Sequence, residues 1–522
     1  MTQSDKPLLP HASSVAGLLF RLMTEDVTTR VNEGVLRGRS RRGIELFAGI
    51  PYAAPPTGSS RFRAPKPPEP WEGTRDARRF GPAAPQLPGT GLTSNFEVPW
   101  DEDCLTLNVV TPACDQARRP VYVWIHGGSY KHGQGATPWY DGTSFATRGD
   151  LVVVTINYRL GALGFCDLGS HLGNDFATCG INGTLDQVAA LNWIKANIGS
   201  FGGDPDCITV GGESAGAFSV CNLLAMEAAS GLFHRAIAQS GACHHTFDPT
   251  EGAVIAKEFL DHLDNPSVDD LMALPVETIL TAQERVSEDR GQGTGRSQEP
   301  FYPVWGHELL PRDPRDLMAD GAGATVPLLT GTNEDEMALW GLTGMSADAL
   351  ARMVGNLTND PDGLTSPYQS RLDNEDSPAS PGWMACAIAT DRVFGVPAVR
   401  HAEYRHPYGA DTWMYRFSWD SRAFDGLFGA AHALEIPFTF NTVNSPGVDT
   451  FLGPGETPTT LAETMHDAWI AFIRDGDPST TALGPWPRYT PDTRAVMELD
   501  TTCSLLHDPR PDERQAWNGL IR

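Results

Sequence analysis

The stretch TVGGESAGA, residues 209–217, contains the pattern Gly-x-Ser-x-Gly with Ser214 at its centre. Residues 207–210 are typical of the end of a β-strand, and residues 215–226 of a helix that begins with small side chains. A serine on such a sharp strand-to-helix turn is strained, with its hydroxyl exposed and a helix N-terminus directed at it. Taken alone, the pentapeptide also fits a glycine-rich turn whose serine has no role, so the context decides.

Composition excludes several classes of protein. The chain has 522 residues, of which 40% are hydrophobic and 20% charged, so it is neither disordered nor short of core-forming residues. Its formal net charge of −26 repels phosphate backbones and anionic lipid. We therefore expect no nucleic-acid or membrane partner, and a neutral or cationic small molecule as the ligand.

The N-terminus and the cysteines indicate the compartment. Residues 1–25 lack the basic start and cleavage site of a signal peptide, and no apolar run is long enough to span a membrane. The nine cysteines are scattered, with no Cys-x-x-Cys pair. A reduced, cytoplasmic protein is the expectation, and no metal-ligand spacing is present.

Strand and helix patterns alternate along the chain. Apolar runs predict strands, helical spacing predicts helices at 186–198 and 463–473, and the alternation favours a doubly wound α/β sheet. The runs Leu105–Val110, Val121–Ile125 and Leu151–Asn157 have the character of parallel strands. Residues Thr28–Leu36 and Gly43–Ala48 suggest an antiparallel hairpin at one edge. Further strands are expected at 208–210, 231–239, 327–330 and 412–419.

The domain organisation is expected to be simple. We predict a leader at 1–25 and one large domain at 26–522, with helical and loop insertions around 246–320 and 341–408. Residues 81–99 form a long Gly/Pro loop of the kind that covers active sites. The polar segments 287–300 and 359–381 are predicted to be flexible.

A dense series of motifs extends this pattern over about residues 28–500. They are FAGIPYA (47–53), EDCLTLNV (102–109), WIHGG (124–128), NYR (157–159), LDQ (185–187), FGGDP (201–205) and the Ser214 turn. With them the chain resembles the type-B carboxylesterases, the carboxylesterase/cholinesterase branch of the α/β-hydrolases, and bacterial para-nitrobenzyl esterases in particular. The resemblance implies a central, mostly parallel twisted sheet flanked by helices, with insertions that form the substrate pocket.

A serine nucleophile needs a base and an acid, and in this fold they follow in the order Ser, acid, His. Three carboxylates compete in the loop Gly331–Glu336, namely Glu334, Asp335 and Glu336. Similarity to the family's Asn-x-Asp-Glu pattern selects Glu336, although Met337 stands where the family usually has glycine. The segment GAAHALEIPF, residues 429–438, resembles the family's catalytic-histidine segment and selects His432. His126 is the rival base, and its place beside Gly127 suggests a supporting role instead.

The resemblance also implies the groups around the triad. The backbone N–H groups of Gly128, Ser129 and Ala215 are expected to form the oxyanion hole. Glu213 and Ser240 stand where the family keeps buried polar residues near the triad, although a purely structural role is equally open. No cofactor and no metal are expected.

Two departures from the family pattern bear on the expected ligand and on the expected disulfides. Cholinesterases hold a quaternary ammonium on a tryptophan at the position of Ser94, so a choline site of that kind is not expected. Secreted relatives pair the cysteine at the position of Cys104 with one that is Ala84 here, so Cys104 should be a free thiol.

The sequence thus predicts a serine hydrolase that cleaves small to medium uncharged carboxylic esters through an acyl-enzyme. An amidase or carbamate hydrolase with the same triad is the first alternative. A non-catalytic, cholinesterase-like binding module is the second, and the complete set of Ser214, Glu336 and His432 argues against it. Monomer and homodimer are equally open.

Overall fold

The structure is a computed structural model that describes residues 25–88, 99–291, 299–374 and 380–521. The expected leader, up to residue 24, and most of the tip of the 81–99 loop lie outside these residues. Within them, thirteen strands form one sheet in the order β1-β2-β3-β5-β7-β6-β8-β9-β10-β11-β12-β13, with β4 paired to β2. The strands are β1 Glu25–Val31, β2 Gly34–Arg41, β3 Ile44–Pro51, β4 Thr74–Asp76, β5 Thr106–Thr111, β6 Arg119–Ile125, β7 Val152–Ile156, β8 Gly203–Glu213, β9 Arg235–Gln239, β10 Leu328–Asn333, β11 Thr412–Phe417, β12 Ala495–Leu499 and β13 Ser504–His507.

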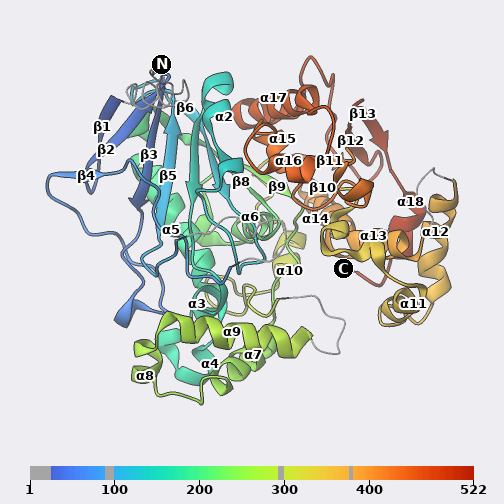
Figure 1. Ribbon diagram of the computed structural model, residues 1–522, viewed down its shortest axis with the longest axis horizontal. Coiled ribbons are helices and arrows are strands. Elements are labelled where there is room, and N and C mark those ends of the chain that lie inside the picture. The colour runs from blue at the N-terminus through green and yellow to red at the C-terminus, as the bar shows by residue number, and fades with distance from the viewer. Residues whose placement is uncertain (1–24, 89–98, 292–298, 375–379, 522) are drawn as a thin grey trace, which may run out of the picture.

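Helices flank the sheet and fill the long connections between its strands (Figure 1). They are α2 Thr143–Gly149, α3 Gly161–Phe165, α4 Gly169–Leu172, α5 Asn182–Asn197, α6 Ala215–Ala225, α7 Pro249–Asp261, α8 Val268–Ala273, α9 Val276–Gly291, α10 Pro314–Ala319, α11 Ala347–Gly355, α12 Pro361–Asn374, α13 Pro381–Thr390, α14 Val396–Arg405, α15 Ile436–Thr439, α16 Val448–Leu452, α17 Thr459–Asp475 and α18 Pro511–Ala516. In the part of the chain that the structure describes, none of them has the length and apolar character that crossing a bilayer requires.

The centre of the sheet is parallel, and the strand pairs on either side of it are antiparallel, except for the short strand β4, which pairs with β2 in parallel. Every neighbouring pair from β7 through β6, β8, β9, β10 and β11 to β12 is parallel. The prediction of a parallel strand at Leu105–Val110 is wrong, because β5 runs antiparallel to both β3 and β7. Its side chains are buried on both faces, and burial on both faces, not strand direction, produces a continuous apolar run. The predicted hairpin is confirmed, with its turn between β1 and β2 inside the run 28–36.

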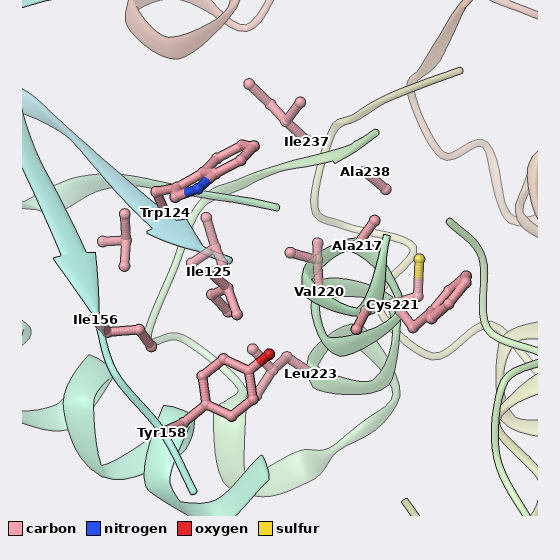
Figure 2. Packing of buried hydrophobic residues seen from close by; sticks show 14 of the residues in the cluster. Trp124, Ile125, Ile156, Tyr158, Ala217, Val220, Cys221, Leu223, Ile237 and Ala238 are labelled. Carbon is pink, nitrogen blue, oxygen red and sulfur yellow. The ribbon is translucent and has the colours of Figure 1, made fainter. Parts of the chain in front are cut away.

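Helix α6 packs directly on the centre of the sheet, against β6, β8 and β9. Figure 2 shows Ala217 and Val220 on the side of the helix that faces Ile125 and the neighbouring strands, with Leu223 beside Tyr158. The close approach depends on Gly216, where a Cβ atom would lie 2.0 Å from the carbonyl oxygen of Ile125. The glycine therefore fixes the depth at which the helix, and the turn before it, sit on the sheet.

The two expected insertions fall between neighbouring strands. Helices α7 to α10 connect β9 to β10, and α11 to α14 connect β10 to β11. The prediction of a flexible segment at 359–381 is wrong over Pro361–Asn374, which is helix α12. Leu364, Tyr368 and Leu372 recur every fourth residue and are buried in a small separate core, a helical period that the polar composition obscures. Helix α9 likewise extends to Gly291, into the segment predicted to be flexible.

All nine cysteines are free thiols. Cys104 is fully buried, and burial raises the pKa of its thiol far above the ordinary value. The prediction that Cys104 lacks a disulfide partner is confirmed. Five more cysteines are also buried, and Cys114, Cys207 and Cys503 are half-buried.

Candidate active site

Ser214 occupies the turn between β8 and α6. Its backbone angles, φ 55° and ψ −123°, lie in a region that residues with a side chain rarely adopt. The turn is held by two hydrogen bonds, from Ser214 N to Gln239 O at 2.9 Å and from Phe218 N to Ser214 O at 2.9 Å. The side chain is buried apart from a small face, with the residue 8% exposed. The strain is that of a nucleophile elbow.

His432 lies on the loop after β11 and touches the carboxylate of Glu336. Nδ1 of the ring is 2.5 Å from Oε2 of Glu336, and both residues are buried. The other oxygen of Glu336 accepts a hydrogen bond from Asn333 N at 2.8 Å, and Glu336 O accepts one from His432 N at 3.2 Å. The carboxylate and the ring are therefore fixed to each other through both side chain and backbone.

The three carboxylates that compete in the sequence have separate partners in the structure. Glu334 pairs with Arg510 and lies 3.9 Å from Arg416. Asp335 accepts a hydrogen bond from Ala430 N at 3.2 Å. Burial, and then the charge of Glu334, raise the pKa of Asp335 to about 7. Of the three, Glu336 is the one in contact with the histidine.

Glu213, which precedes Ser214, reaches the opposite side of the same ring. Its Oε1 lies 3.0 Å from Nε2 of His432. Among the residues that the structure describes, the hydroxyl of Ser214 has no hydrogen bond to His432. The imidazole is thus flanked by two carboxylates. Burial by itself lowers the pKa of His432, but the charges and hydrogen bonds of Glu213 and Glu336 outweigh it and raise the pKa well above 6.5.

A third buried carboxyl group, that of Glu435, is close enough to Glu213 and Glu336 for their charges to affect it. The sequence patterns did not predict it. Gln239 Nε2 donates to its Oε1 at 3.0 Å and Asn333 Nδ2 donates to its Oε2 at 2.7 Å. Burial, and then the charges of Glu213 and Glu336, raise its pKa to about 8, so it is mostly protonated at pH 7. The only signal in the sequence was a charged residue in the apolar segment 429–438.

The glycine loop after β6 lies against the serine. A Cβ atom on Gly127 would come within 3.0 Å of Ser214 Cβ. Gly128 has φ 111° and Ser129 has φ 56°, so both lie in the left-handed region. Within the described residues, no acceptor is hydrogen-bonded to the backbone N–H groups of Gly128, Ser129 or Ala215. Three unpaired donors near one serine hydroxyl are what an oxyanion hole requires.

The same loop is held from behind by His126 and Lys131. Nδ1 of His126 lies 2.8 Å from Gly127 O, and its ring stacks on Tyr158 at 4.6 Å. Burial lowers the pKa of His126 to about 4. Lys131 Nζ lies 2.8 Å from a carboxylate oxygen of Glu284 on α9. His126, the rival base, thus supports the glycine loop and has no carboxylate partner in the described residues.

Ser240 is buried at the end of β9, with φ 53° and its N–H donating to Gly331 O at 2.8 Å. Its hydroxyl has no partner in the described part of the chain. Two aromatic rings missed from the sequence touch the histidine. The centroids of Trp340 and Phe394 lie 5.1 Å and 4.8 Å from that of His432, and Trp340 is 49% exposed.

Two surface cavities lie away from these residues. One of about 420 Å³ is lined by Asp206, His234 and Trp413, among others, and one of about 820 Å³ lies between α11, α12 and the start of α13. Within the described ranges, no three His, Cys, Asp or Glu side chains gather in a way that could hold a metal ion.

Comparison with known proteins agrees with this fold. Residues 24–517 match the model of the carboxylesterase family. The chain is 37% identical over 505 residues to a para-nitrobenzyl esterase of Bacillus subtilis, covering 94% of this chain and 98% of that protein. It is 36% identical over 509 residues to a phenmedipham hydrolase of Pseudarthrobacter oxydans, covering 92% and 96%. The crystal structure of a Geobacillus stearothermophilus carboxylesterase at pH 6.2 superimposes with a TM-score of 0.82 and 38% identity, covering 94% and 99% of the two chains.

The sheet, the flanking helices and the strained serine turn define an α/β-hydrolase. Within that class, the chain belongs to the carboxylesterase family, and it is an enzyme that hydrolyses carboxylic esters.

Proposed function

We propose that Ser214, His432 and Glu336 are the nucleophile, base and acid of a two-step ester hydrolysis. The contact between His432 Nδ1 and Glu336 Oε2, at 2.5 Å, carries the proposal. Glu336 holds the proton on Nδ1 and leaves the lone pair of Nε2 as the acceptor. Nε2 takes the proton of Ser214 as its oxygen attacks the ester carbonyl, and returns the proton to the leaving alcohol. A water molecule, activated in the same way, then releases the acid from the acyl-enzyme.

The backbone donors of Gly128, Ser129 and Ala215 are proposed to receive the negative charge on the carbonyl oxygen. Their N–H groups have no other partner in the described residues, so no hydrogen bond has to break when the charge forms. One donor of this kind contributes about 2.7–4 kcal/mol to transition-state stability. The left-handed φ of Ser129 means that its backbone is set for this role while its side chain is incidental.

Glu213 is proposed to compete with Ser214 for Nε2 of His432. In the resting arrangement its Oε1 lies 3.0 Å from that nitrogen, an arrangement that stores a proton on the ring. Attack by the serine needs the ring to be neutral, so Glu213 sets the pH at which the base becomes available. Ser240 and Glu435 are proposed to support the site without touching substrate.

We expect the pH dependence of kcat/KM to show this effect of Glu213 on His432. Activity requires unprotonated His432, and the two carboxylates raise its pKa well above 6.5, so the ascending limb should have its midpoint above pH 6.5. Glu213→Gln removes one of the two charges and should move the midpoint to lower pH by roughly one unit. Exposed Glu227, just after the end of α6, provides the control variant Glu227→Gln. An unchanged midpoint in Glu213→Gln would contradict the assignment.

The substrate is proposed to be a small to medium uncharged ester. The net charge of −26 and the buried carboxylates at the site both disfavour anionic substrates. Turnover of para-nitrophenyl acetate should exceed that of the matching para-nitroanilide by about 100-fold or more, because the anilide leaving group needs a proton before it departs. Comparable rates would favour the amidase or carbamate alternative, and no turnover of either would favour a binding module.

We also propose that residues 26–522 form one catalytic domain, because a single sheet extends from β1 to β13 and one main core cluster spans Val31 to Leu499. Nine free thiols support a reducing compartment, the cytoplasm. The acidic net charge supports the absence of nucleic-acid and membrane partners.

A further inference from the structure

A row of aromatic rings extends from His432 toward the glycine loop. We call Trp340, Phe394, Phe218, His245 and Tyr302 the aromatic cluster. The rings of Trp340 and Phe394 are 6.5 Å apart and within 18° of parallel, and those of Phe394 and Phe218 are 6.4 Å apart and within 13°. The ring of His245 stacks on Phe218 at 3.7 Å and 11°. Near-parallel rings of this kind form a surface on which a further aromatic ring can stack.

The two ends of the cluster have different neighbours. Trp340 and Phe394 contact His432, which delivers the proton to the leaving alcohol. Phe218 lies one turn after Ser214 on α6. Tyr302 packs on His245 at 5.6 Å and on Tyr130, the residue after Ser129, at 5.4 Å. Through Tyr302 and Tyr130, the His245 end is linked to the loop that carries two of the proposed oxyanion donors, and on that side we place the acyl part of an ester.

His245 is a polar group in this aromatic surface with its hydrogen bonds unused. Neither ring nitrogen has a partner in the described residues, and Nδ1 is fully buried. By contrast, Nε2 of the adjacent His244 lies 2.9 Å from Val393 O. Burial, and then His244 and His432, lower the pKa of His245 well below 6.5, so the ring is neutral at pH 7. A neutral imidazole offers one donor and one acceptor, and leaving the buried Nδ1 unpaired is unfavourable.

We propose that His245 determines acyl-group specificity by hydrogen-bonding a hydroxyl on an aromatic acyl group that stacks against Phe218 and Phe394. A hydroxyl both donates and accepts, which matches a neutral imidazole. A carboxylate substituent would instead meet the buried negative charges of Glu213 and Glu336. The proposal rests on the proposed function, since it assigns a substrate class to the same site.

The test uses para-nitrophenyl esters of benzoic, 3-hydroxybenzoic and 4-hydroxybenzoic acid. His245→Phe keeps the stacking ring and removes the hydrogen bond, so it should lower the ratio of kcat/KM for a hydroxybenzoate to that for benzoate by about five- to tenfold. Turnover of benzoate should fall less than that of either hydroxybenzoate, because the benzoyl ring has no hydroxyl to lose a partner. His245→Leu should lower the ratio similarly if the phenylalanine variant folds poorly. His262→Phe, at the end of α7, is the control and should leave the ratio unchanged.

Four results would overturn the proposal. One is an unchanged ratio in His245→Phe and His245→Leu. Another is an equal loss on benzoate and hydroxybenzoates, which indicates a packing role. The third is no turnover of any benzoyl ester by wild-type enzyme that hydrolyses the acetate. If His245 instead affects the ratio of 4-hydroxyphenyl acetate to phenyl acetate, the acyl placement is wrong. Failure of the proposed function is distinct, because Ser214→Ala would then hydrolyse every ester as well as wild type does.

Discussion

Ser214→Ala should abolish ester hydrolysis, with kcat falling by roughly 10⁴–10⁶-fold. The hydroxyl is the group that we propose forms the acyl-enzyme, because Ser214 occupies the strained turn and the N–H groups of Gly128 and Ser129 have no acceptor in the described residues. The residual rate comes from binding and the oxyanion donors alone. Steady-state turnover of para-nitrophenyl acetate, with active-site titration by an organophosphate, measures the loss.

The control is Ser219→Ala on the same helix. Ser219 is fully buried, and its hydroxyl donates to Ala215 O at 2.9 Å and contacts Tyr130. Its removal should lower the midpoint of thermal unfolding by a few degrees and change kcat by less than about tenfold. The organophosphate should label Ser214 in the wild type and nothing in Ser214→Ala. Label on another residue, or activity retained in Ser214→Ala, would refute the nucleophile.

Glu336→Gln is expected to be the second most damaging substitution, with kcat falling by about 10³–10⁴-fold. The amide is close in size to the carboxylate, but it can present its NH₂ to Nδ1 and so reverse the tautomer of His432. The accepting lone pair then faces the wrong side of the ring. The midpoint of thermal unfolding should change little, because the hydrogen bond from Asn333 N to the side chain of residue 336 can be kept.

The adjacent carboxylates are the matched controls. Asp335→Asn removes a group whose pKa is already raised to about 7 and whose partner is a backbone N–H, so its activity should fall by less than about tenfold. Glu334→Gln breaks the pair with Arg510 and should act on stability. Comparing kcat for the three variants assigns the acid. A loss of kcat in Asp335→Asn as large as that in Glu336→Gln would contradict the assignment of Glu336 as the acid.

The main strands and helices could be predicted from the sequence because the patterns that indicate them are local. The glycines around Ser214, the apolar runs and the helical spacing at 186–198 each depend on a few neighbouring residues, and β8, α6 and α5 appear where they were expected. Strand direction is not local. The run at β5 looks parallel because it is buried on both faces, while its antiparallel pairing is set by β3 and β7.

The electrostatics of the site could not be derived in the same way. Similarity to the family pattern selects Glu336 among residues 334–336, but the physical difference between the three acids comes from the folded chain, which gives Glu334 an arginine, Asp335 a backbone N–H and Glu336 the histidine. Neither the segment 429–438, which contains Glu435, nor the sequence around His245 indicates a role for these two residues. Their properties arise from burial and from neighbours more than 50 residues away in the chain, such as Asn333 and Tyr302.

The nine unpaired cysteines give the molecule built-in reporters of its own opening. Cys114, Cys207 and Cys503 are half-buried, whereas the other six are enclosed in the core. Thiol reagents attack the thiolate, and burial raises the pKa of Cys104, Cys166 and Cys221 far above the ordinary value. A dye that reacts with thiols should therefore label the three half-buried cysteines during local fluctuations and the six buried ones only on global unfolding. No engineered label is needed.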